Sequence, residues 1–531
     1  MSTPAAQPRF TLRLALGLLG VLIAALSAGL NDRVTDMALV EIRVGLGIGK
    51  DESSWITGVY QAAQVAAMLI APWFAVTFTL RRVALLVVTL LTLIALLLPW
   101  VSSLPLFLGL RVIQGLMAGA LPPLLMTGAL RFMPPNIKLY GLSAYALTAT
   151  LGPNLAAPLA AFWTDSVGWA FIFWQIVPGG LLALPLIAWG LPQDPPRLER
   201  FQQMDWLGML TGGSALALLV LTLQQGERLN WLQSPLISGM FLSGMALLIV
   251  FVLNEWWHPL PLFKFQMLAR PNVAHGLLTL AGILLLALSG SALPSAWSGQ
   301  VEGFRLAQFA PLALIIAIPQ LLLAPLIATL LYAKRVDCRW VLCLGALLLM
   351  AACLLGSQLT SGWSRQNFWV IQSLQAVGQP MMVLGVLMSA TSVVAPLEGP
   401  FAAAMFNSVR GIASVGGAAL LETVMSHREK FHSHILLENI SNRAVLITAD
   451  AGQMPDAHAP LYTTGAADSE RLAQFAQIVR HQAHILSISD VYLLLAGFAV
   501  MLIAFTLLLP QRVWTPHILF TSATPVTRDP R

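Results

Sequence analysis

The most constraining feature of this sequence is a series of long apolar stretches separated by short polar and charged clusters. A helix that crosses a lipid bilayer needs about 20 consecutive, mostly apolar residues. The first stretch is uncharged from Leu14 to Asn31, and comparable stretches recur along the chain. Overall, 57% of the 531 residues are apolar and 10% are charged, against about a quarter charged in soluble chains. The sequence therefore predicts an all-α integral membrane protein and excludes an ordinary soluble enzyme, a secreted disulfide module and a disordered tail.

Fourteen membrane-spanning helices are expected from the positions of these stretches. Their orientation follows from the loops, because Lys and Arg collect in cytoplasmic loops. With the N-terminus inside, the inner loops and tails hold sixteen Lys and Arg residues, and the outer short loops hold six. This asymmetry supports fourteen spans with both termini in the cytoplasm. The expected spans are 14–31, 54–79, 83–101, 105–130, 139–162, 168–190, 207–225, 234–254, 271–297, 306–333, 340–359, 367–390, 399–423 and 490–510.

An internal repeat relates two parts of the chain. The Ala-Pro pairs at residues 71–72 and 324–325 each stand eleven residues before an Arg-Val pair, an offset of 253 residues. Residues 111–114, Arg-Val-Ile-Gln, resemble residues 369–372, Trp-Val-Ile-Gln, at an offset of 258. Each copy would hold six spans, and an even number keeps both copies in the same orientation. The sequence predicts two parallel six-helix bundles, an arrangement that suits transport by alternating access.

The repeat divides the chain into three predicted parts. Residues 1–190 form the first bundle, residues 191–270 form a two-helix insertion with its linkers, and residues 271–531 form the second bundle. The second bundle includes a polar segment, residues 426–489, which this topology places outside. Apolar residues at helical spacing predict that two amphipathic helices extend the last two spans outward. Six of the nine histidines lie here, in a pattern that matches no strong metal-ligand spacing: His427, His432, His434, His458, His481 and His484.

Few ionisable residues lie inside the expected spans, where charges are costly and usually functional. Asp32 and Asp36 end the first expected helix, and Arg111 lies in the fourth. At a rise of 1.5 Å per residue, Asp32 and Arg111 fall at comparable depth in the outer half. We predict that Arg111 faces these acids or polar helix neighbours, and that all three residues couple transport to protons, since an adjacent Arg favours a charged carboxylate. A structural ion pair, or acids already in the outer loop, is the alternative.

Other polar residues in the spans are candidates for lining a substrate cavity. Arg410 lies in the middle of its helix, where it would bind an anionic substrate or cap carbonyls of a broken helix. Its helix is rich in small residues, which close helix packing explains equally well. The predicted cavity residues are Asn31, Gln61, Gln64, Gln114, Asn154 and Arg410. No phosphate loop, zinc ligand set or nucleophile elbow is present, so neither an enzyme, a cofactor nor a metal site is predicted. Nucleic acid is not an expected partner, because the net charge of +6 is confined to short loops and tails.

The sequence resembles the major facilitator superfamily, and within it the fourteen-helix drug:proton antiporters. Residues 111–115 are similar to the helix 4 motif, whose arginine is implicated in proton coupling. Residues 151–161 are similar to the helix 5 antiporter motif, which assigns gating or packing roles to Gly152, Pro153 and Pro158. The family's loop between helices 2 and 3 carries a basic pair, here Arg81 and Arg82. Trp73 and Thr77 replace the Gly and Asp that precede this pair in the family.

This resemblance implies a proton-coupled secondary transporter that exports amphipathic or aromatic small molecules across the inner membrane. Its expected partners are membrane lipid, the substrate and protons. Residues 426–440 resemble the long outer segment of members that work with a periplasmic adaptor, which suggests an adaptor and an outer-membrane channel as further partners. Two alternatives stay open: a dedicated exporter or importer of one metabolite, such as a siderophore, and a non-transporting membrane receptor or scaffold.

Overall fold

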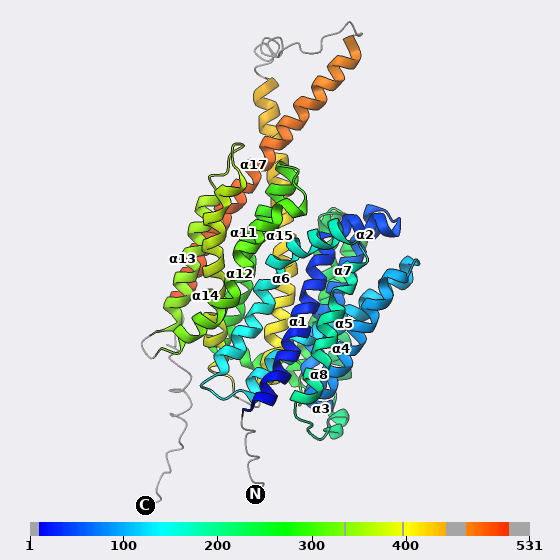
Figure 1. Ribbon diagram of the computed structural model, residues 1–531, viewed down its shortest axis with the longest axis vertical. Coiled ribbons are helices and arrows are strands. Elements are labelled where there is room, and N and C mark those ends of the chain that lie inside the picture. The colour runs from blue at the N-terminus through cyan, green and yellow to red at the C-terminus, as the bar shows by residue number, and fades with distance from the viewer. Residues whose placement is uncertain (1–9, 334–335, 396–397, 442–463, 509–531) are drawn as a thin grey trace, which may run out of the picture.

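The computed structural model describes residues 10–333, 336–395, 398–441 and 464–508, which are helical and contain no strand (Figure 1). Fourteen long helices run along one common direction. Their bounds in the first half are α1 (Leu12–Met37), α3 (Lys50–Phe78), α4 (Leu80–Leu97), α5 (Leu104–Phe132), α6 (Lys138–Ser166) and α8 (Ile176–Gly190). The inserted pair is α9 (Trp206–Gly226) and α10 (Pro235–Trp257). The second half consists of α11 (Pro271–Ala296), α12 (Leu306–Leu331), α13 (Cys338–Gly356), α14 (Phe368–Thr391), α15 (Gly399–Ser441) and α17 (Thr464–Leu507).

Short helices connect several of these elements: α2 (Leu39–Leu46), α7 (Phe171–Trp174) and η2 (Leu198–Gln203). The expected span 168–190 is thus divided, with a break at Gln175 between α7 and α8. The first span is longer than expected, because α1 continues through Met37. Asp32 and Asp36 therefore lie inside a helix rather than in a loop.

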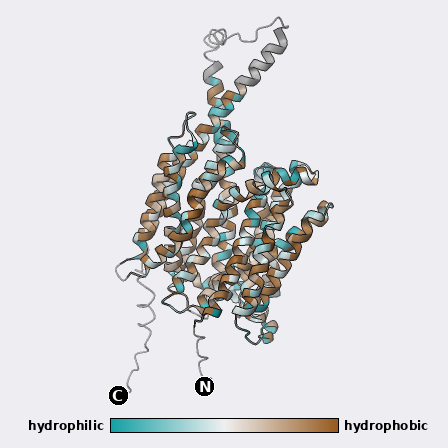
Figure 2. Cartoon of the chain, viewed as in Figure 1, coloured by the Kyte–Doolittle hydropathy of each residue, from teal (hydrophilic) through white to brown (hydrophobic). Residues whose placement is uncertain are grey.

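Thirteen helices in the described residues are long and apolar enough to cross a membrane. The fourteenth long helix, α6, has 29 residues, but its buried positions include Tyr145, Thr148, Thr150 and Asn154. These polar side chains lower its hydropathy, although it lies among the other helices of the bundle. Hydrophobic residues cover much of the bundle, and hydrophilic residues gather towards its ends (Figure 2). The chain is a multi-pass membrane protein.

The packing of the helices repeats between the two halves. In the first half α1 packs on α6 and α8, α3 packs on α5, and α4 packs on α5 and α8. The helices that the sequence repeat makes equivalent form the same pairs in the second half: α11 with α15 and α17, α12 with α14, and α13 with α14 and α17. Between the halves, α3 packs on α15, and α12 packs on α6. These two seams are equivalent under the repeat, as a pseudo-two-fold arrangement of parallel bundles requires.

The inserted helices form a hairpin beside the first half. α9 and α10 pack on each other, and α9 also packs on α3 and α15. Asp205 caps α9 by accepting a hydrogen bond from the Gly208 amide at 2.6 Å, and it also accepts one from Asn254 of α10. The hairpin is therefore closed by a buried side-chain contact at the end where it joins the linker.

Helices α15 and α17 continue beyond the bundle as a two-helix extension (Figure 1). We name the side of the bundle that carries it the extension face, and α1 begins on the opposite face. Asp490 joins the two helices at the base of the extension by accepting hydrogen bonds from Arg428 and His432. Residues 442–463, with His458, lie outside the described residues. No group of histidines or acids that could hold a metal ion occurs in the part of the chain that the structure describes.

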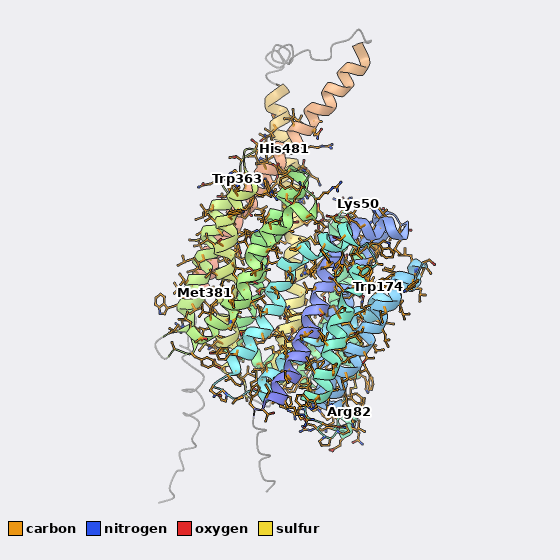
Figure 3. The ribbon with its side chains drawn as sticks, viewed as in Figure 1. Lys50, Arg82, Trp174, Trp363, Met381 and His481 are labelled. Atoms are coloured by element: carbon orange, nitrogen blue, oxygen red, sulfur yellow. The ribbon has the colours of Figure 1, made fainter. Side chains whose placement is uncertain are left out.

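Lys50 lies towards the extension face and Arg82 lies at the opposite face (Figure 3). An ionic cluster also lies near the opposite face, in the connections before α11 and α15. Glu398 accepts two hydrogen bonds from Arg270, at 2.6 and 3.0 Å, and one from Lys264 at 3.0 Å. The paired hydrogen bonds from Arg270 are the main cause that lowers the pKa of Glu398 to about 2. This cluster ties the connection that precedes the second half to the start of α15.

Glycines permit the close approach of α3 and α5. A Cβ atom at Gly115 would collide with the carbonyl oxygen of Tyr60, and one at Gly119 would collide with that of Gln64. The two glycines are four residues apart and so share one helix face, the small-residue pattern that lets membrane helices pack backbone to backbone. This contact fixes which residues of α5 face α3.

We predict that Gly119→Ala destabilises the protein by about 1–3 kcal/mol, because the added methyl group forces α3 and α5 apart. The measurement is the thermal unfolding of the purified protein. Gly109→Ala on the same helix is the matched control, since a Cβ at Gly109 meets no atom within 4 Å. Equal stability of the two variants would show that the close helix contact is absent.

We also predict that acid weakens the Glu398 cluster. A carboxyl group whose folded pKa is about 2, against an ordinary value of 4.5, contributes stability above about pH 4.5, and this contribution is lost as the pH falls towards 2. The melting temperature of the wild type should therefore fall between pH 5 and pH 3. Glu398→Gln should melt lower at pH 7 and lose less on acidification, whereas the exposed Glu41→Gln should follow the wild type. An identical acid response in Glu398→Gln would contradict the prediction.

Candidate functional site

A cavity of about 230 Å³ lies between the two halves, from the middle of the bundle towards the extension face. The first half contributes residues of α1, α3 and α6, and the second half contributes residues of α11, α14 and α15. Apolar side chains of α11, including Ile283, Leu284 and Leu288, form one wall. Its polar and charged lining residues include Asp32, Arg33, Asp36, Gln61, Gln64, Thr148, Asn154, Gln379, Arg410 and Ser414.

Asp32 is the buried acid of this cavity, with 5% of its surface exposed. Gln61 of α3 donates a hydrogen bond from Nε2 to Asp32 Oδ1 at 3.3 Å. Arg33 Nε lies 4.0 Å from the other carboxylate oxygen. Asp36, one helical turn further along α1, is exposed. One acid is thus enclosed with a hydrogen-bond donor and a cation, and the other lines the same cavity closer to the extension face.

Arg111 is completely buried beside this cavity, because the glycine contact one turn later holds its part of α5 against α3. Its Nη1 donates to Gln114 Oε1 at 2.6 Å, and its Nε donates to the carbonyl oxygen of Ile56 at 3.4 Å. Its Nη2 has no hydrogen-bond partner among the described residues. Arg111 therefore faces polar helix neighbours and not lipid, and no ion pair within 4.0 Å joins it to Asp32 in the described chain.

Tyr60 connects Arg111 to α1. Its ring centre lies 4.1 Å from the Arg111 guanidinium carbon, within the range of a cation–π contact. Its hydroxyl donates to the carbonyl oxygen of Ala28 at 3.4 Å. Tyr60 was not among the site residues predicted from the sequence. The available signal was its type, since a tyrosine buried in an apolar helix usually needs a partner for its hydroxyl group.

Arginines cross the seam between the halves at the cavity. Arg410 of α15 donates from Nη1 to Thr148 Oγ1 at 2.9 Å and from Nη2 to the Thr148 carbonyl oxygen at 2.7 Å. Arg33 of α1 donates to Ser414 Oγ of α15 at 2.7 Å. Both side chains use hydroxyl or carbonyl acceptors of the other half. They hold α15 against α1 and α6 around the cavity.

The bundle is closed between the cavity and the opposite face. Tyr145 of α6 donates from its hydroxyl to Asn407 Oδ1 of α15 at 2.9 Å. Nearer the opposite face, Tyr332 of α12 donates to the carbonyl oxygen of Pro135 at 3.0 Å and accepts from the amide of Leu139 at 2.9 Å. These contacts join the two halves. The cavity is therefore separated from the opposite face, while exposed Asp36 lies at its other end.

A chain of neutral amides lies in the second half. Gln379 Oε1 accepts hydrogen bonds from Gln320 at 2.9 Å and from Asn154 of the first half at 3.5 Å. Gln379 Nε2 donates to Gln375 at 3.1 Å, and Gln375 donates to Ser289 Oγ at 2.6 Å. Of these residues, Asn154 alone was predicted from the sequence. The ionisable lining residues belong to the first half, apart from Arg410, and the amide network belongs to the second half, apart from Asn154.

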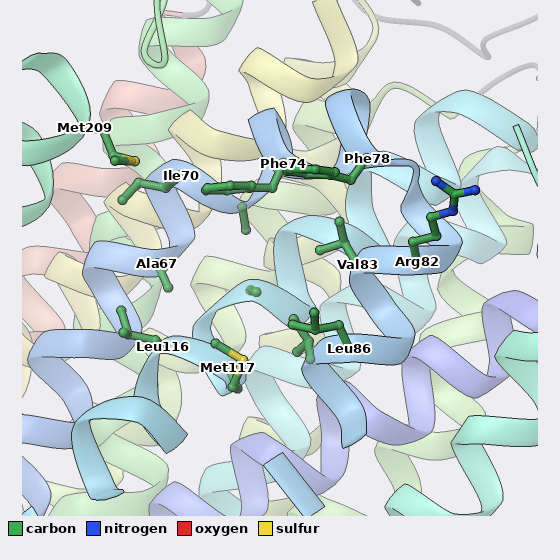
Figure 4. A pocket seen from close by; sticks show the side chains of 13 residues that line it. Ala67, Ile70, Phe74, Phe78, Arg82, Val83, Leu86, Leu116, Met117 and Met209 are labelled. Atoms are coloured by element: carbon green, nitrogen blue, oxygen red, sulfur yellow. The ribbon is translucent and has the colours of Figure 1, made fainter. Parts of the chain in front are cut away.

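The remaining predicted site residues occupy different places. Asn31 and Gln114 are buried but do not line the cavity, whereas Gly152 and Pro153 line it. Pro158 lies further along α6, outside the lining. Arg82 lines a separate apolar cavity of about 460 Å³ with Phe74, Phe78 and Met117 (Figure 4), and Arg81 beside it lines neither cavity. The functional roles of all these residues stay predictions.

Comparison with known proteins identifies the family. Residues 21–418 match the family model described as Major Facilitator Superfamily. The chain belongs to this superfamily. The predicted major facilitator fold is confirmed by this match and by the structure of the proton:xylose symporter XylE, which has a TM-score of 0.54 and 13% identity. That comparison covers 96% of this chain and 98% of the symporter.

Curated relatives lie within the same superfamily of transporters. The multidrug export protein EmrB of Haemophilus influenzae is 24% identical over 495 residues, which cover 91% of this chain and 94% of EmrB. The uncharacterized MFS-type transporter Rv1250 of Mycobacterium tuberculosis is 29% identical over 263 residues, and this match spans 48% of this chain and less than half, 44%, of that relative. The family assignment agrees with the resemblance found in the sequence.

Proposed function

We propose that this major facilitator protein is a proton-coupled secondary transporter that exports amphipathic or aromatic small molecules across an inner membrane. The observation that carries the proposal is the position of Asp32, a buried acid in the wall of a cavity that both halves enclose. The name of the relative EmrB, a multidrug export protein, supports the direction and the class of substrate. The apolar wall of α11 and the neutral amides suit a largely apolar molecule with a few polar groups.

The geometry supports a simple coupling scheme. In its charged form, Asp32 is held by the hydrogen bond from Gln61 and by attraction to Arg33. A proton that enters from the extension face would remove this charge and weaken both interactions. α1 would then be freer to move against α15, to which Arg33 is hydrogen-bonded. Arg111 would act as a fixed charge behind Tyr60, and release of the proton would follow when Asp32 faces the other side.

The proposed orientation places the opposite face in the cytoplasm. Basic residues gather in the connections at that face, among them Arg81, Arg82, Arg131, Arg197 and Arg200. The positive-inside rule assigns such connections to the cytoplasm. Both ends of the chain are then cytoplasmic, because fourteen crossings return the chain to the face where it began. The cavity faces the periplasm in this conformation.

The extension is the proposed contact for a periplasmic adaptor protein. Phe431 and Ile435 of α15 are 48% and 37% exposed on its surface, and Ile478 of α17 is 52% exposed. Such apolar side chains on a polar projection above the membrane are typical of a protein-binding surface. An adaptor held there would receive the substrate near the mouth of the cavity and deliver it to an outer-membrane channel.

We predict that Asp32→Asn abolishes coupling without abolishing binding. In everted vesicles, an imposed pH gradient should drive substrate accumulation by the wild type and at least about tenfold less by Asp32→Asn, because the amide carries no titratable proton. Substrate exchange without a gradient should continue. Arg111→Ala should lose gradient-driven transport as well.

The exposed Asp165→Asn, which removes a carboxylate at the far end of α6, is the matched control and should transport normally. Gradient-driven transport at the wild-type rate in Asp32→Asn would remove the coupling assignment. No gradient-driven uptake of any drug, dye or siderophore by the wild type would count against the function itself.

We further predict that Phe431→Ser with Ile435→Ser loses copurification of the adaptor protein and drug resistance of whole cells. Flux in everted vesicles should remain within about twofold of the wild type, because the substitutions lie away from the cavity. Lys430→Ser, an exposed substitution on the same helix, is the control. Full resistance in the double variant would argue against this docking surface.

A further inference from the structure

A third cavity, of about 260 Å³, lies at the opposite face where three parts of the chain meet. Trp73 and Val76 of α3 line it from the first half, and Pro400 and Phe401 at the start of α15 line it from the second half. The linker helix η2 and residues 260–262, which follow α10, complete its walls. It shares no lining residue with the cavity of about 230 Å³ that lies between the two halves.

Two arginines of the linker line this cavity without an acidic partner. Neither Arg197 nor Arg200 forms a side-chain hydrogen bond or an ion pair within 4.0 Å among the described residues. Of the nearby acids, Glu398 is already bound to Arg270 and Lys264, and Glu199 is exposed. Burial, and then the neighbouring charge of Arg197, lower the pKa of Arg200. Two cations therefore stand close together at this cavity: Arg197 is exposed, Arg200 is half-buried, and neither is paired with an acid among the described residues.

The indole of Trp73 forms part of the wall of the same cavity. Trp73 is 5% exposed, and its indole Nε1–H is buried with no hydrogen-bond partner. Edge-to-face contacts with Phe74 and Phe201 hold the indole ring in place. Gln203 adds a side-chain amide to the lining. The described lining contains no carboxylate, so its polar groups are chiefly donors and cations, while Leu262 and Pro261 supply apolar walls.

We propose that this cavity binds a phosphate group, held by Arg197 and Arg200, with the indole ring of Trp73 in its wall. Guanidinium groups present paired N–H donors that match phosphate oxygens, and such charge-assisted hydrogen bonds are strong. The phosphate group belongs either to an anionic phospholipid of the adjacent leaflet or to a soluble phosphate compound. Both share the chemistry that the cavity recognises.

A bound phosphate group would link parts that must separate during alternating access. The walls come from α3, from the linker to the inserted hairpin, and from α15, so the ligand contacts both halves at the face that is closed in this conformation. Any ligand that binds one conformation preferentially shifts the population towards it. Phosphate binding therefore favours the conformation with the opposite face closed.

The test measures binding and not transport, so it stands apart from the proposed function. The full-length protein is purified in neutral detergent free of phosphate, and its melting temperature is measured with inorganic phosphate or with sodium chloride at equal ionic strength. A second arm compares nanodiscs of phosphatidylcholine with nanodiscs that also contain phosphatidylglycerol. We expect at least one probe to raise the melting temperature by about 2 °C or more, since a ligand that binds the folded state stabilises it. A shift with phosphate identifies a soluble source, and a shift with phosphatidylglycerol alone identifies the lipid.

Arg200→Gln should lose this shift, and Arg197→Gln should reduce it. Arg305→Gln removes the same charge from an exposed arginine before α12 and should keep the full shift. Gln203→Glu places a carboxylate beside the arginines and should also suppress the shift in melting temperature. This variant replaces Arg200→Gln in the test if Arg200→Gln does not fold. No shift in the wild type with either probe, or an undiminished shift in both Arg200→Gln and Gln203→Glu, would overturn the proposal.

Discussion

The close contact between α3 and α5 is the interaction on which the site depends. Helices in lipid gain no hydrophobic free energy from packing together, so small residues that let backbones approach take over that role. Gly115 and Gly119 bring α5 against the carbonyl oxygens of Tyr60 and Gln64. Arg111 lies one turn before Gly115, so the same contact directs its guanidinium to the Ile56 carbonyl oxygen and the Tyr60 ring. A buried cation is tolerated here because neighbouring polar groups and an aromatic ring surround it.

The duplication has produced two halves with the same helix pairs and different chemistry. Gln114 and Gln372 occupy equivalent positions, yet Arg111 corresponds to Trp369. The first half keeps an acid and a cation near the cavity, and the second half contributes amides that hydrogen-bond to one another. An amide network orders a buried region without the desolvation cost of full charges. In the proposed transport scheme the first half would carry the proton, and the second half would contribute neutral hydrogen-bonding groups to the substrate cavity.

Much of the fold was predictable because apolar length is a property of the sequence itself. The spans, the repeat and the outward continuation of the last two spans all follow from patterns along one dimension. The depth of a residue along its helix could also be calculated from the sequence, and this depth is similar for Arg111 and Asp32. The direction in which a side chain points around the helix axis could not be predicted in this way, because it depends on which neighbouring helix packs on which face. For this reason Tyr60 and Gln379 were missed, while Asn31 and Gln114 were expected in a cavity that they do not line.

The inserted hairpin makes the two flanks of the molecule unequal. α9 packs on α3 and α15 together, so it covers one of the two seams between the halves. At the other seam, where α6 meets α12, α14 packs on both partners, and the inserted hairpin has no counterpart there in the described chain. The hairpin therefore lies outside the α3–α15 seam alone, and the α6–α12 seam is formed by helices of the two bundles. Two extra helices thus make the two sides of a pseudo-two-fold bundle different towards the surrounding lipid.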